Sequence, residues 1–228
     1  MKTIYKIART ELQTLFYSPV AWLILVIFTF QVSMAFSDRI TWHLKDLLLN
    51  NRTSEGLTAY FLLTGFGNPL FPGVLSYLYL YFPLLTMGLM SREFSSGSIK
   101  LLYSSPITST QIVLGKFFSM MIFAFLLVGI FVIYVIYSLF VVEHFDVLYI
   151  LTGILGIYLL ICTYASIGLF MSTISSYQII AAVGTFVLLI FLNFVSSIWQ
   201  DIDFVRDVTF WLSLRGRAES FTGGLISS

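Results

Sequence analysis

The chain has 228 residues, of which 58% are hydrophobic and only 10% are charged. Its mean hydropathy is +0.94, which excludes a water-soluble domain of ordinary composition. The formal net charge of +1 argues against nucleic acid as the default partner. Cys162 is the single cysteine, which excludes an intrachain disulfide and a cysteine-based metal site. The composition therefore predicts a membrane protein.

Residues 2–17 predict an amphipathic helix. Apolar residues recur there at spacings of three and four, and Lys2, Lys6 and Arg9 fall on the opposite face. A basic amphipathic helix beside a membrane span lies in the plane of the interface; the alternative is a frayed tail. Ser18 and Pro19 then end this helix, with Ser18 as the N-cap and Pro19 as the first residue of the next helix.

Long apolar runs predict the membrane spans, because about 20 residues of helix cross the hydrocarbon core. The fold class is all-α, a polytopic bundle whose five predicted spans cover residues 20–36, 70–90, 117–142, 148–171 and 178–199. Residues 37–69 are expected to form a polar loop in which Ile40–Leu49 can form a short surface helix, and His43 and His144 are expected to be surface residues. The whole chain is one transmembrane domain.

Several residues inside the predicted spans have two interpretations. Tyr77, Tyr79 and Tyr81 can pack against neighbouring helices or line a conduit for a substrate, and packing is the preferred interpretation. Small residues such as Gly156 and Gly168 in the fourth span let neighbouring helices approach closely.

A polar segment, residues 91–116, separates the second and third spans. Gly97 follows two serines and indicates a turn, and Pro106 breaks the short helix before it. Thr108 and Gln111 have the spacing of a capping box, which starts a new helix. We expect a short segment with an apolar face, outside the bilayer, to which a soluble partner can bind.

This segment resembles the corresponding loop of ABC-2 type permeases. The pattern begins at Glu93, continues through Gly97-Ser98-Ile99 and a leucine pair to Pro106, and ends at the Gly-Lys step before the third span. Ser98 is a mild departure, since threonine is commoner there. The resemblance implies docking on an ATP-hydrolysing subunit, and the residues implied in that contact are Glu93, Gly97, Ile99, Lys100, Leu101, Leu102, Pro106 and Lys116. We expect Ile99, Leu101 and Leu102 to be buried against that subunit, with Glu93 and Lys100 at the rim; the alternative is an ordinary cytoplasmic loop.

The resemblance implies the permease subunit of an ATP-driven exporter, closest to the gliding-motility-associated subclass. It also implies a second permease copy or a homologous permease, a bacterial inner membrane with the N-terminus in the cytoplasm, and ATP and Mg bound to the partner subunit. The chain itself is not expected to be an enzyme, because Gly115-Lys116 is followed by Phe117 and not by the serine or threonine of a Walker A motif.

All Lys, Arg, Asp and Glu residues fall outside the five predicted spans. Ion-coupled transporters usually need ionisable groups at membrane depth, so we expect transport that does not depend on a proton gradient. Two other classes stay open, a non-transporting membrane scaffold or receptor and, with less support, a channel. Charged filters are typical of channels, and the spans contain none.

The resemblance also implies six spans, whereas the sequence predicts five. We therefore expect Ser228 to be a truncation point, and the gene to continue with about 20 apolar residues that cross the bilayer once.

Overall fold

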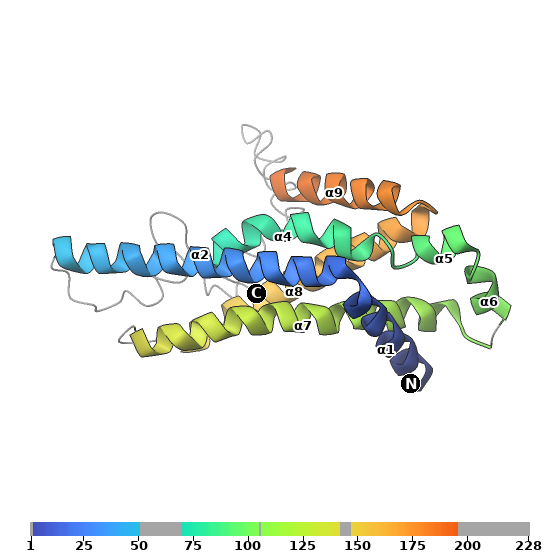
Figure 1. Cartoon of the computed structure of the whole chain (residues 1–228), viewed down its shortest axis with the longest axis horizontal. Coiled ribbons are helices and arrows are strands. Elements are labelled where there is room, and N and C mark those ends of the chain that lie inside the picture. Colours follow the sequence, from blue (N-terminus) through green and yellow to red (C-terminus); the bar gives the residue numbers. More distant parts are fainter. Residues whose placement is uncertain (1, 51–69, 105, 142–146, 196–228) are drawn as a thin grey trace, which may run out of the picture. The chain divides into compact units, whose positions relative to one another are not determined.

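A computed structural model describes residues 2–50, 70–104, 106–141 and 147–195. The secondary-structure elements of these residues are α-helices, as the sequence predicts. The helices are α1 (Lys2–Tyr17), α2 (Pro19–Asn50), α4 (Leu70–Thr86), α5 (Ser91–Ser96), α6 (Ile99–Ser104), α7 (Ser109–Val141), α8 (Val147–Ile174) and α9 (Gln178–Phe194) (Figure 1). The polar residues 51–69, residues 142–146 with His144, and the segment from residue 196 onward lie outside the described residues.

Three helical stretches are long and apolar enough to cross a membrane, Pro19–Asp38, Ser109–Tyr137 and Leu151–Ile174. The helices α4 and α9 are also apolar and have 17 residues each, which is close to the shortest length that spans the hydrocarbon core. The chain is a multi-pass membrane protein.

Three predicted boundaries differ from the observed helices. Residues 37–50 continue α2 instead of beginning a loop, because the stretch from residue 20 to 50 contains no proline or glycine that would end the helix. The second predicted span ends as a helix at Thr86 rather than at residue 90. The third span belongs to a helix that begins at Ser109, so Lys116 lies inside α7 and not in the loop before it.

Two predicted helix starts are confirmed by their hydrogen bonds. The hydroxyl of Ser18 accepts the N–H of Val20 at 3.3 Å, and the chain bends there between α1 and α2 (Figure 1). Thr108 and Gln111 exchange side-chain to backbone bonds of 3.4 Å in both directions, which is a capping box. Before α9, the hydroxyl of Ser175 accepts the N–H of Tyr177 at 3.1 Å, and α9 begins at Gln178, where the fifth span is predicted to begin.

The helices contribute to two compact units. The first contains Met1–Leu25, Leu78–Leu126 and Ile161–Leu192, and its core includes Phe82 and Tyr164, whose ring centroids are 5.9 Å apart. The second contains Val26–Tyr77, Leu127–Leu160 and Asn193–Ser228. In the described part of the second unit, the Phe36 ring lies 5.5 Å from that of Tyr134 and 5.8 Å from that of Tyr137.

Candidate functional site around Lys116

The side chain of Lys116 is 1% exposed and joins three other segments of the first unit to α7. Its Nζ lies 2.5 Å from Glu11 Oε1 on α1 and 2.6 Å from Glu93 Oε1 on α5. It also donates a hydrogen bond of 2.6 Å to the carbonyl oxygen of Leu89, in the turn after α4. One buried ammonium group therefore holds α1, the turn after α4 and the start of α5 against α7.

Gly115 explains how α1 comes close enough for this contact. A Cβ atom at this position would lie 2.6 Å from Cγ2 of Ile7 and 3.3 Å from the backbone oxygen of Ile4. Only a residue without a side chain leaves room for α1 there. In the Gly115-Lys116 pair, the first residue permits the close approach of α1 and the second forms the ionic contact with it.

The charges in this cluster do not balance. One ammonium group faces two carboxylates, a formal charge of −1, and Glu93 Oε2 is buried without a hydrogen-bond partner among the described residues. Removing charges from water is costly, so buried ion pairs are poor sources of stability, but loss of one partner is strongly destabilising. The arrangement therefore couples the positions of α1, α5 and α7 rather than supplying a catalytic group.

Apolar side chains hold the loop against the helices on either side of it. Met90, Ile99 and Ile112 are buried together, and the partly buried residues around them are Ile7, Phe94 and Ile107. Between α5 and α6, Gly97 adopts a left-handed conformation with φ of 72° and donates its N–H to Phe94 O at 3.2 Å. The glycine allows the chain to turn so that Ile99 points inward.

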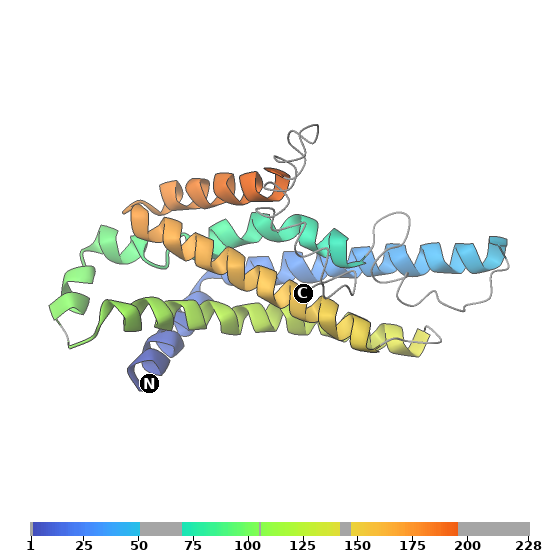
Figure 2. The same cartoon turned by 180° about the vertical axis from the view of Figure 1, so that it is seen from behind.

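The end of α8 secures the turn before α5. The hydroxyl of Ser172 accepts the N–H groups of Met90 at 3.0 Å and Ser91 at 3.1 Å, and donates to Met87 O at 3.1 Å. Figure 2 shows the end of α8 beside this turn. Ser172 is fully buried, so these bonds satisfy backbone groups that water does not reach.

The structure separates the predicted docking residues into two groups. Lys100, Leu101 and Pro106 are exposed, Leu101 by 74%. Ile99, 8% exposed, and Lys116 are covered by their own chain. The Glu93 side chain is 19% exposed and is paired with Lys116. The side chain of Leu102 lies outside the described part of the chain.

Sequence reasoning missed two residues of this site. Glu11 is the only acidic residue in the basic helix α1, and an isolated acid on such a helix is a usable signal for an ionic contact. Ser172 gives no signal, because serine in an apolar helix usually bonds its own backbone.

These observations define a polytopic helical membrane protein with a folded loop between two of its apolar helices. A family model described as ABC-2 family transporter protein matches residues 5–202. The chain therefore belongs to the ABC-2 family of transporter proteins and is a membrane component of an ABC transporter. No curated protein and no solved structure matches the chain significantly.

Proposed function

We propose that the chain is the permease subunit of an ATP-driven exporter in a bacterial inner membrane, with its N-terminus in the cytoplasm. A separate subunit binds ATP and Mg and docks on the loop that contains α5 and α6. A second permease copy completes the transport path. Membership of the ABC-2 family and the folded state of the loop support this proposal.

The main support for the proposal is the exposed apolar side chain of Leu101, on a loop that buried contacts hold against the neighbouring helices. Leu101 is 74% exposed, whereas Ile99, two residues before it, is buried. Lys100 and Pro106 are exposed on the same loop. An exposed leucine flanked by a cation suits an interface with an apolar centre and a polar rim.

The buried contacts beneath Leu101 supply the mechanical link. A displacement of α6 is transmitted to α7 through the contact of Ile99 with Ile112. A displacement of α5 is transmitted to α1 and α7 through the ion pairs of Glu93 and Lys116. Closure of the ATP-binding subunits then moves helices as rigid elements, which is the usual form of such transitions.

The test is a pull-down of ATP-binding subunits with the chain from its native membrane. The Leu101→Glu variant places a charge at the centre of the proposed interface and should release the subunit. Gln13→Glu adds the same charge at an exposed position of α1 and should leave binding unchanged. Normal binding by the Leu101→Glu protein would contradict the docking site, and the absence of any ATP-binding partner would favour a scaffold.

A further inference from the structure

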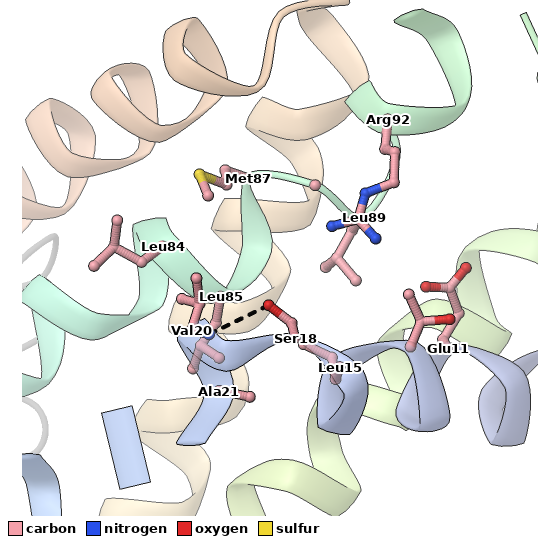
Figure 3. Close-up of a pocket in the computed structure, with 12 residues that line it drawn as sticks. Glu11, Leu15, Ser18, Val20, Ala21, Leu84, Leu85, Met87, Leu89 and Arg92 are labelled. Carbon is pink, nitrogen blue, oxygen red and sulfur yellow. Dashed lines mark hydrogen bonds between the residues drawn. The ribbon is translucent and has the colours of Figure 1, made fainter. Parts of the chain in front are cut away.

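A pocket opens beside the bend between α1 and α2, within the first unit (Figure 3). One part of its lining is polar and includes Glu11, Ser18 and Arg92. The other part is apolar and includes Val20, Ala21, Leu84 and Leu85. Such a division suits an amphiphilic ligand rather than a purely polar or purely apolar one.

Trp22, which follows the pocket residue Ala21, indicates that the pocket lies at the level of the lipid headgroups. The indole N–H of Trp22 donates to Phe16 O at 2.8 Å, and the Trp22 side chain is 56% exposed. Tryptophan prefers the membrane–water interface. Beyond it, Leu23 and Val26 on α2 are exposed apolar residues, as expected of a surface that faces acyl chains.

Arg92 brings an unpaired cation to the polar part. Its guanidinium lies close to Gly88, where an added Cβ atom would be 3.0 Å from Nη2, and it points toward Leu89 in Figure 3. It forms no ion pair with any residue that the structure describes. A guanidinium is well suited to a phosphate group, to which it can donate two parallel hydrogen bonds.

Glu11 brings negative charge to the same pocket. Its carboxylate is 20% exposed and belongs to the Lys116 cluster, whose formal charge is −1. The pocket therefore has a cation at Arg92 and a carboxylate at Glu11, one oxygen of which also binds Lys116. A ligand that matches both carries a phosphate and an ammonium group.

We propose that this pocket binds the headgroup of an aminophospholipid such as phosphatidylethanolamine. The phosphate contacts Arg92, and the ammonium group lies near Glu11. An acyl chain extends out of the pocket along Leu84, which is 45% exposed. The hydroxyl of Ser18 already accepts a backbone N–H, which leaves its own proton for a phosphate oxygen. Arg92 belongs to α5, in the loop proposed above as the docking site, but Leu101, whose exposed side chain supports that docking site, does not line the pocket.

Native mass spectrometry of the purified chain tests the proposal. The detergent-solubilised protein is mixed with phosphatidylethanolamine, phosphatidylcholine or phosphatidylglycerol of identical acyl chains. Phosphatidylethanolamine should be retained best, and Arg92→Gln should lower its retention about tenfold, the loss expected for one charged hydrogen-bond pair. Arg92→Lys should retain part of the binding. Arg9→Gln removes an exposed charge from α1 outside the pocket and should have no effect.

Three results would overturn the proposal. The first is equal retention of phosphatidylglycerol and phosphatidylethanolamine by the wild-type protein, a comparison that needs no variant to fold. The second is an equal loss with Arg9→Gln and Arg92→Gln. The third is stabilisation by soluble phosphoethanolamine that matches stabilisation by the lipid in thermal unfolding, because the ligand would then be a free metabolite.

Discussion

Lys116 Nζ lies 2.6 Å from Glu93 Oε1, and both groups lie beneath the loop surface rather than on it. The two residues are the first and last charged members of the pattern that resembles the ABC-2 loop. Their contact joins the two ends of the loop. Leu101, which lies between Glu93 and Lys116 in the sequence, is exposed. The pattern therefore encodes the internal anchoring of the loop as well as a surface.

Lys116→Met should lower the free energy of unfolding by about 3 kcal/mol, because two carboxylates lose their buried partner. Thermal unfolding in detergent measures the change, and Lys6→Met, at an exposed position of α1, serves as the control. Combining Lys116→Met with Glu11→Gln and Glu93→Gln should recover part of the loss, since no unpaired charge remains. If Lys116→Met and Lys6→Met unfold alike, the cluster does not hold the segments together.

Ser172→Ala should destabilise the turn before α5 by about 2 kcal/mol, because two buried N–H groups lose their acceptor. The neighbouring variant Thr173→Ala removes a hydroxyl that is bonded within its own helix, to Phe170 O, and should change little. Hydrogen exchange at Met90 and Ser91 reports the effect directly. Unchanged protection of these two amides in Ser172→Ala would refute the role of the hydroxyl.

Gly168→Ala should separate α8 from α4, because a Cβ atom there would lie 2.6 Å from Cβ of Thr86. We expect a loss of about 1–3 kcal/mol from overpacking, measured by thermal unfolding. Gly129→Ala is the matched control in α7, since nothing lies within 4 Å of its Cβ position; it should be neutral or slightly stabilising. A stable Gly168→Ala protein would mean that the two helices are not in close contact.

Gly97→Ala should loosen the connection between α5 and α6. The space around Gly97 is open, so the penalty comes from its φ of 72° and not from a clash; it should amount to about 1 kcal/mol. Gly97→Asn should be tolerated better, because asparagine adopts this conformation more readily. Trypsin cleavage after Lys100 should be faster in Gly97→Ala only, and equal rates in the two variants would argue against a conformational requirement.

Transport reconstituted with the ATP-binding subunit should survive an uncoupler and stop without ATP. The three long apolar stretches contain only Asp38, at an end, and Lys116 among their Asp, Glu, Lys and Arg residues. Lys116 is committed to two carboxylates, so it does not offer a carrier for protons across the membrane. Loss of transport on addition of the uncoupler, with ATP still present, would contradict this expectation.

Local patterns in the sequence determined much of the secondary structure. The amphipathic period of residues 2–17 predicted α1, and the spacing of Thr108 and Gln111 predicted the start of α7. These predictions succeeded because each depends on residues within one or two helical turns. The extension of α2 to Asn50 was missed because polar side chains suggested a loop where nothing ends the helix.

The tertiary structure alone decided which loop residues point inward. A helix of six residues such as α6 has no period long enough to show which of its apolar side chains is covered. Lys116 meets Glu11 across 105 positions of the chain, and Ser172 meets Met90 across 82. Such contacts follow from the packing of α1, α7 and α8, and no local pattern specifies them.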